Sequence, residues 1–287
     1  MPFCTTCGNE LSSEARFCGR CGSPFGESAA AVPAVSASAP LDYTIQGDNL
    51  QVARIRLKPG QEVYAEAGKM VYKNPAVVWE TRMSGQTIGE KLIGALKRKL
   101  SGESLFLTYF RATGPNAEAG FAGDYPGRLQ AYDLAPGQSI LVQRDSFICA
   151  QTSVQFSIAL VKKIGAGLFG GEGFILQKLT GPGTAFIHGG GDFIEFNLAA
   201  GEVLQVDTGC IVAFDESVEY DIQFVSGIKT AIFGGEGLFL ATLRGPGRVV
   251  VQSLTLEKLR RELTPTRTGG DERGPLGALG GWFSSED

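Results

Sequence analysis

The sequence FGGEGFILQKLTGPG occupies residues 169–183, and FGGEGLFLATLRGPG repeats it at residues 233–247. A more divergent copy, SGESLFLTYF, lies at residues 101–110. Successive copies are 69 and 64 residues apart, measured between their shared glutamates Glu103, Glu172 and Glu236. Units of this length are too long for the coils of a solenoid. They indicate three β-modules packed around a pseudo-threefold axis.

A strand–turn–strand pattern also occurs three times, at residues 57–63, 134–140 and 198–203. Each copy has a glycine where a tight turn needs a positive φ, namely Gly60, Gly137 and Gly201. Residues 52–57 alternate in the way expected of a half-buried strand. Helical periodicity is confined to residues 86–100 and 254–263. We therefore predict a mainly β fold of antiparallel sheets, arranged as a sandwich or barrel.

Composition divides the chain into four parts. Residues 1–25 hold two cysteine pairs, and residues 26–40 are almost entirely Ala, Ser, Val and Pro, which is typical of a flexible linker. Residues 41–262 hold the β domain, with repeats at about 41–125, 126–190 and 191–258. Residues 263–287 are rich in Thr, Gly, Pro and charge, which predicts a disordered tail. Trp282-Phe283 in this tail is either a short docking motif or without a role.

The two N-terminal CxxC pairs predict a metal site. Each pair ends in a CG dipeptide, and glycine there lets backbone amides turn toward the thiolates. Four thiolates in two close pairs suit a closed tetrahedral zinc site, and metal binding supplies most of the folding free energy of so short a segment. The alternative, a redox CxxC, normally occurs once and opens a helix. The segment resembles bacterial zinc ribbons, with structural Zn²⁺ on Cys4, Cys7, Cys18 and Cys21.

The overall composition argues against several classes of protein. The net charge of -4 gives no global attraction to nucleic acid or anionic membrane. No apolar run of about 18 residues is present, so we expect no transmembrane helix. The N-terminus lacks the basic and apolar regions of a secretory signal, and paired cysteines suit a reducing compartment. We expect a cytoplasmic protein, or one held peripherally at the inner membrane face.

The Pro-Gly turn strands, the Gly-Glu blocks, the Gly-Pro-Gly turns and the segment VDTGCIVAF at residues 206–214 together resemble one widespread bacterial family. Its members have a fold like the tryptophan RNA-binding attenuation protein and are related to a fungal mitochondrial inner-membrane biogenesis protein. The resemblance covers about residues 41–258. It implies a β-sandwich core with internal threefold repetition and no established enzymatic activity, and it gives no catalytic residue. A likeness in fold to an RNA-binding protein does not indicate RNA binding.

Residues 86–100 form a basic amphipathic segment. Apolar side chains recur there at every fourth position, and Lys91, Lys97, Arg98 and Lys99 lie on the other faces. Such a helix suits anionic lipid headgroups or an acidic partner surface. It equally suits packing on the β domain with a solvated basic side, which is the commoner case for surface helices.

The remaining candidate site residues give weaker indications of a catalytic or binding role. Residues 165–170 match GxGxxG, but a strand-like segment follows where a dinucleotide site needs a helix, so we reject that site. The three block glutamates either converge on a cation at the axis or face water. His188, placed in a predicted glycine-rich loop, has no nucleophile beside it in sequence. Two further cysteines lie in apolar strand-like runs and are expected to act as small hydrophobic residues, Cys149 and Cys210.

These observations predict a binding or scaffold protein rather than an enzyme. We expect a homo-oligomer in which the zinc ribbon acts as an adaptor for protein partners. One alternative is a peripheral membrane organiser that uses residues 86–100. Another is a nucleic-acid-binding module that uses the ribbon, which the negative net charge and the scarcity of Lys and Arg in the ribbon disfavour.

Overall fold

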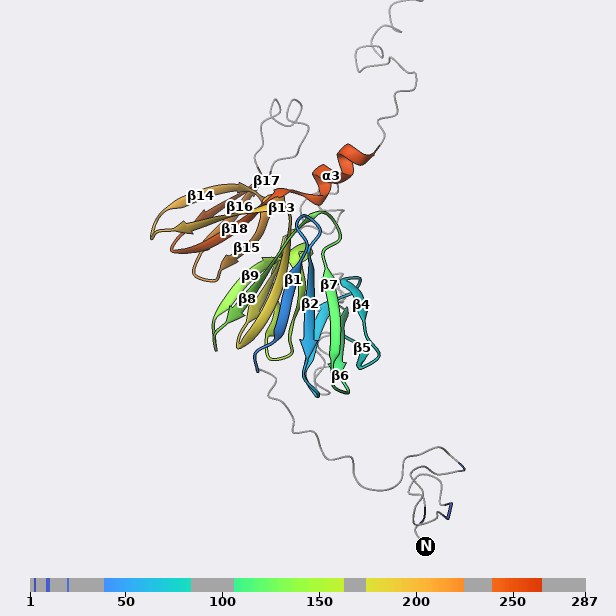
Figure 1. Cartoon of the computed structure of the whole chain (residues 1–287). Helices are drawn as coiled ribbons and strands as arrows, with labels where there is room; N and C mark the ends of the chain where they lie inside the picture. The colour runs from blue at the N-terminus through green and yellow to red at the C-terminus, as the bar shows by residue number, and fades with distance from the viewer. Residues whose placement is uncertain are drawn as a thin grey trace, which may run out of the picture.

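The computed structural model describes residues 39–83, 106–162, 174–224 and 239–264, together with Phe3, Asn9, Glu10 and Arg20. These ranges consist almost entirely of antiparallel strands stacked in sheets (Figure 1). The mainly β fold predicted from the sequence is therefore confirmed. A single α-helix is present in the described part, α3 (Leu256–Leu263), whose first turn is capped by the Thr255 side chain accepting a hydrogen bond from the Lys258 amide.

The first part of the domain contains seven strands: β1 (Asp42–Gln46), β2 (Val52–Leu57), β3 (Glu62–Glu66), β4 (Met70–Lys73), β5 (Val77–Met83), β6 (Phe106–Ala112) and β7 (Ala117–Ala122). Strands β1, β2, β7 and β4 form a four-stranded sheet in that order. Strands β3, β6 and β5 pair with one another and belong to the large central sheet. The predicted half-buried strand is β2, with Ala53, Ile55 and Leu57 buried.

The second part runs through β8 (Gly127–Leu134), β9 (Ser139–Gln143), η1 (Arg144–Ser146), β10 (Phe147–Gln151), β11 (Gln155–Lys162), β12 (Phe174–Thr180) and β13 (Gly183–Leu198). The third contains β14 (Val203–Asp207), η3 (Thr208–Cys210), β15 (Ile211–Asp215), β16 (Glu219–Phe224), β17 (Phe239–Arg244) and β18 (Gly247–Leu254). The central sheet follows the order β11-β12-β9-β15-β18-β13-β10-β3-β6-β5, with β8 also paired to β13. Strands β14, β17 and β16 form a separate three-stranded sheet.

Two kinds of strand triplet recur along the described chain. In the first kind, which we call triplet A, the members are β2-β7-β4, then β8-β13-β10, then β13-β18-β15. In the second kind, triplet B, they are β3-β6-β5, then β9-β12-β11, then β14-β17-β16. The same pairing order thus occurs three times. Its arrangement about a threefold axis stays a prediction.

The strand–turn–strand prediction is confirmed in detail. Gly60, Gly137 and Gly201 have φ values of 83°, 78° and 81°, in the region that glycine adopts without steric cost. Each turn is closed by a backbone hydrogen bond spanning three residues, as in Gln61 N to Lys58 O at 2.8 Å. In each, the side chain following the glycine also accepts a hydrogen bond from the backbone amide that begins the turn. Each turn therefore fixes the register of the strands beside it.

Apolar side chains between the triplets form three clusters of buried residues. In the first, Phe121 is fully buried and meets Phe110 edge to face, with ring centroids 5.0 Å apart. Edge-to-face contact suits the quadrupoles of aromatic rings and adds to the stabilisation from burial. The sheets thus pack on one another through shared apolar clusters.

Two sequence predictions need correction. His188 does not lie in a loop: it is in the middle of β13, a 16-residue strand that pairs with β8 and β10 in its first half and with β18 in its second half. Cys210 ends the turn η3 and is half-buried rather than lying within a strand. Cys149, by contrast, is fully buried in β10 as expected, and burial raises the pKa of its thiol.

Candidate functional site

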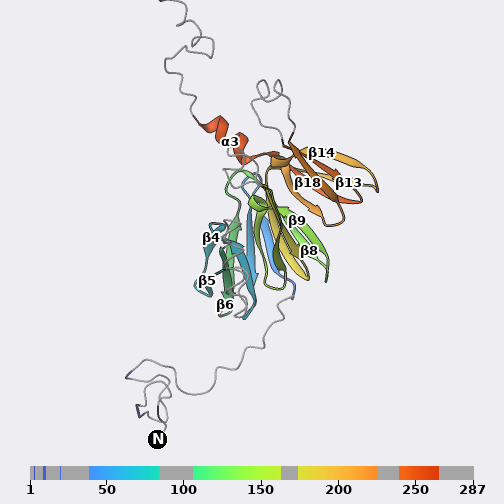
Figure 2. The same ribbon diagram turned by 180° about the vertical axis from the view of Figure 1, so that it is seen from behind.

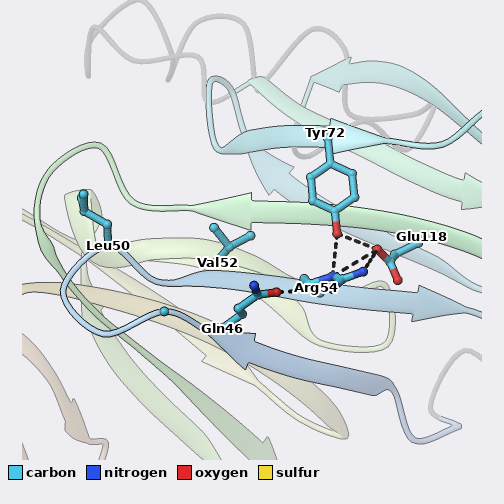
Figure 3. Close-up of a pocket in the computed structure, with 7 residues that line it drawn as sticks. Gln46, Leu50, Val52, Arg54, Tyr72 and Glu118 are labelled. Atoms are coloured by element: carbon cyan, nitrogen blue, oxygen red, sulfur yellow. Dashed lines mark hydrogen bonds and ion pairs between the residues drawn. The ribbon is translucent and has the colours of Figure 1, made fainter.

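The outer face of the four-stranded sheet carries a polar pocket of about 430 Å³ (Figure 3). Strand alternation creates it, since Ala53 and Ile55 of β2 point into the core and Arg54 between them points outward. Glu118 of β7 and Tyr72 of β4 face the same side, and Gln46 and Leu50 line the rim. The pocket is thus built from all four strands of this sheet and the turn after β1.

Arg54, Glu118 and Tyr72 form a closed hydrogen-bonded network. The Arg54 Nη2 lies 2.8 Å and its Nε 3.2 Å from Glu118 Oε1. The Tyr72 hydroxyl donates to the same carboxylate oxygen at 2.6 Å and accepts from Arg54 Nε at 3.0 Å. Both interactions favour the charged carboxylate, so the Tyr72 hydrogen bond, followed by Arg54, lowers the pKa of Glu118.

Neighbouring residues hold this network in place. The Tyr72 ring lies directly over Gly120, where any Cβ would overlap the ring. Arg56 lies 3.6 Å from Glu118 Oε2 and 2.8 Å from Asp42, so its charge is shared between two carboxylates. Two arginines and two carboxylates therefore balance one another across the face. Such a pocket offers a ligand hydrogen-bonding groups beside the apolar side chains of Leu50 and Val52.

Replacing Tyr72 by Phe is expected to cost about 1 kcal/mol of unfolding free energy, because Glu118 and Arg54 each lose one hydrogen bond. Urea unfolding monitored by circular dichroism would measure the loss. The control is Tyr220→Phe, because no hydrogen bond of that hydroxyl is found within the described ranges. Equal stabilities for the two variants would show that the network contributes nothing measurable.

A second set of polar side chains lies around His188, below the surface of the domain. This side chain is 2% exposed and meets the Tyr125 ring edge to face, with ring centroids 4.9 Å apart. The Tyr125 hydroxyl donates to Gln252 Oε1 at 3.1 Å, and the same oxygen accepts from the Gly190 amide at 2.7 Å. Lys69 is 6% exposed and pairs with Asp124 at 2.6 Å.

Desolvation shifts the pKa of His188 and the pKa of Glu66, a half-buried residue at the end of β3, in opposite senses. Desolvation, helped by the charge of Lys69, lowers the pKa of His188 to about 4. Desolvation raises the pKa of Glu66 to about 7, although a hydrogen bond from Gln177 at 2.8 Å and the charge of Lys69 act against it. Both residues are therefore held in their neutral forms over much of the weakly acidic range.

These shifts predict opposite pH dependences for two variants. Unfolded His188 binds a proton below about pH 6.5 while the folded group resists it until about pH 4, so its contribution to stability is lost as pH falls through this window. Folded Glu66 keeps its proton up to about pH 7 and unfolded Glu only to about 4.5, so its contribution is lost as pH rises. The wild-type protein should show a shallow net dependence.

With Glu66→Gln, stability should fall by about 2 kcal/mol from pH 8 to pH 5, because the His188 contribution is no longer opposed. With His188→Gln, stability should instead rise over the same interval. We expect glutamine to fit at position 188, because Gln252 occupies the equivalent place in β18. Urea unfolding at pH 5, 6.5 and 8 measures both slopes. Parallel slopes for the two variants would contradict the assignment.

Most of the sequence-predicted site residues lie outside the described ranges. This applies to the block glutamates Glu103, Glu172 and Glu236, to residues 86–100, to the GxGxxG segment, to Trp282-Phe283 and to the cysteines Cys4, Cys7, Cys18 and Cys21. Phe3 and Glu10, which flank the first cysteine pair in sequence, form an antiparallel bridge, as a ribbon hairpin would require. The described residues contain no group of three or more His, Cys, Asp or Glu side chains arranged to hold a metal ion.

Sequence reasoning did not identify the residues of the outer pocket. Arg54 and Arg56 alternate with buried apolar residues in β2, which was a usable sign that both arginines face outward. Their acidic partner Glu118 is more than 60 residues away, so only the pairing of β2 with β7 reveals the network.

Among the described residues, no helix is long and apolar enough to cross a membrane.

A family model described as mitochondrial biogenesis AIM24 matches residues 43–254. The chain belongs to the AIM24 family. This match confirms the predicted relation to the mitochondrial biogenesis family, while the likeness in fold to the tryptophan RNA-binding attenuation protein stays a prediction. A zinc-ribbon domain model also matches residues 3–25, the segment that holds the four predicted cysteine ligands.

Two bacterial proteins are similar to this chain over most of its length. An uncharacterized protein of Streptococcus pyogenes is 33% identical over 210 residues, which are 72% of this chain and 83% of the relative. An X-ray crystal structure of a Streptococcus pyogenes protein, solved by a structural genomics consortium, has a TM-score of 0.63 and 28% identity. The match covers 78% of this chain and 98% of that protein. The structural match thus spans nearly the whole length of that bacterial protein.

Proposed function

We propose that this protein is a non-enzymatic scaffold whose β domain carries the N-terminal zinc ribbon as an adaptor for protein partners. The observation that carries the proposal is the closed Arg54–Glu118–Tyr72 network. A catalytic pocket needs an acid, base or nucleophile that is available to a substrate. Here the charged side chains that face the pocket are already engaged with one another, and His188 is buried beneath the surface.

The ribbon is the part suited to an adaptor role. A four-cysteine zinc site has no open coordination position, so its metal holds the fold together rather than activating water. A linker of the composition found at residues 26–40 gives such a module a wide reach from the β domain. A module that its own metal ion holds together needs no contact with the β domain to fold, so either part could bind while the other stays unchanged.

A quantitative pull-down from the native cytoplasm tests the proposal. Wild-type protein is compared with Cys4→Ser/Cys7→Ser, and Thr5→Ser/Thr6→Ser serves as a matched control inside the same ribbon. Specific partners should be lost with the cysteine variant and retained with the threonine variant. Retention of the same partners by both would overturn the adaptor function and move binding to the β domain.

We also propose that the β domain shares its fold ancestry with the tryptophan RNA-binding attenuation protein. Antiparallel triplets that pack face to face over shared apolar clusters support it. It adds no proposal of RNA binding, because fold alone does not transmit function.

A further inference from the structure

Two strands at the ends of the domain are edge strands. Within the described ranges, β4 pairs only with β7, and β14 pairs only with β17. The two views from opposite sides place β14 and β4 at opposite ends of the stacked sheets (Figures 1 and 2). An edge strand presents a row of backbone donors and acceptors that can pair with another strand.

Inside the domain, neighbouring modules are joined by strands equivalent to these two edge strands. Triplet A of the second module joins triplet B of the first through β10 and β3, with Cys149 opposite Ala65 and Ala150 opposite Tyr64. Triplet A of the third module joins triplet B of the second through β15 and β9, with Ala213 opposite Val142 and Phe214 opposite Leu141. Both junctions are antiparallel and have the same register.

Strand β4 is the first-module counterpart of β10 and β15. Each of the three pairs with the middle strand of its own triplet A, and each has a register shift at the same place. The shift lies between Met70 and Tyr72 in β4, between Phe147 and Cys149 in β10, and between Ile211 and Ala213 in β15. In the same way β14 is the third-module counterpart of β3 and β9. The two end strands are thus the two halves of one more junction.

The exposed fractions of equivalent residues differ between the internal junctions and the two end strands. The residue at the register shift is fully buried where a junction exists, at Ile148 and Val212, but its counterpart Val71 is 57% exposed. In triplet B, Tyr64 and Leu141 are 3% and 5% exposed, whereas their counterpart Gln205 is exposed. The end strands therefore lack the cover that the same positions have inside the domain.

We infer that β4 of one copy of this protein pairs with β14 of a second copy. The internal junctions fix the register: Tyr72 lies opposite Val206 of the neighbouring copy, and Lys73 opposite its Gln205. The pairing joins the four-stranded sheet of one copy to the three-stranded sheet of the next and covers Val71. Because the two surfaces differ, the contact is heterologous and builds rings or open chains of copies.

This interface deepens the proposed scaffold function and rests on it, because an assembly would display several zinc ribbons at once. Multiple ribbons would raise the avidity for a partner that has repeated binding sites. The interface involves only strands of the β domain. Its test is therefore independent of the ribbon pull-down: loss of the junction would leave an adaptor intact, and loss of the adaptor would leave the junction intact.

Disulfide trapping tests the register directly. Full-length Lys73→Cys and Gln205→Cys proteins are oxidised separately and as a mixture, then resolved by non-reducing electrophoresis. Opposed residues of an antiparallel pair lie within the Cα separation that a disulfide spans. The mixture should form disulfide-linked dimers, and each variant alone should form no more than oxidised wild-type protein.

The matched control replaces Gln205→Cys by Gln223→Cys, on β16 at the other edge of the same three-stranded sheet. Its mixture with Lys73→Cys should stay at the background level. Equal yields from the two mixtures would overturn the proposed register, and dimers from Lys73→Cys alone would show a symmetric contact instead.

Molar mass in solution provides the second measurement. Wild-type protein should show a mass of several chains of 30.4 kDa by light scattering, falling on dilution. Val71→Asp places a charge at the junction and should give the mass of one chain. Ile194→Asp is the control, since Ile194 is 47% exposed on the non-edge strand β13. A wild-type protein of one-chain mass at every concentration would overturn the inference.

Discussion

Replacing Cys4 and Cys7 by serine is expected to abolish zinc binding and to unfold residues 1–25, while the β domain keeps its unfolding transition. A ribbon of this size buries too little apolar surface to fold alone. Metal coordination by four thiolates contributes on the order of 10 kcal/mol, which makes this the largest single effect we predict for the chain. Removing two ligands leaves a site too weak to offset the entropy of ordering the segment.

Metal analysis of the purified protein checks the first half of this expectation, with one zinc per chain in the wild type and none in the variant. Amide hydrogen exchange of residues 1–25 checks the second half, since protection should disappear there and persist in β2 and β13. The matched control is Thr5→Ser/Thr6→Ser, which keeps all four thiolates. Zinc retained by Cys4→Ser/Cys7→Ser would show that these residues are not ligands.

Features encoded locally in the sequence were predicted well. The alternation in residues 52–57 corresponds to β2, and the turn glycines adopt the positive φ that was expected. The closing helix also lies where its periodicity placed it. These features depend on residues a few positions apart, so hydrophobic period and turn chemistry determine them without knowledge of the fold.

Features set by strand pairing could not be predicted in the same way. Glu118 meets Arg54 only because β7 pairs with β2, and the pairing of β10 with β3 brings together residues more than 80 positions apart. The glycines around His188 suggested a loop because glycine is common in turns. In the structure these glycines serve close packing inside a strand: a Cβ at Gly189 would overlap the Phe193 ring, one at Gly190 would overlap the Leu254 carbonyl oxygen, and Gly191 has a φ of 67°. Glycines with these roles have no local signature distinct from that of a turn.

The placement of His188 explains why glycines gather around it. Its ring fills the space beside Gly123 and Gly127, and a Cβ at either position would overlap the imidazole. At Gly127 the Cβ would also overlap the carbonyl oxygen of Gly189, because β8 and β13 pair at this point. Backbone on one side and a buried ring on the other leave no direction in which an added side chain could move.

Gly127→Val is therefore expected to destabilise the β domain by about 3 kcal/mol or more, although valine favours strands and glycine disfavours them. To admit the side chain, β8 must separate from β13 and give up part of its pairing with residues 183–190. Thermal and urea unfolding measure the loss. The control is Gly114→Val, since a Cβ at Gly114 meets nothing within 4 Å. Equal losses of stability in the two variants would show that Gly127 is not needed for the close packing of β8 on β13 around His188. A large loss in Gly127→Val alone would show that this close approach of the two strands, rather than a flexible loop, requires glycine at position 127.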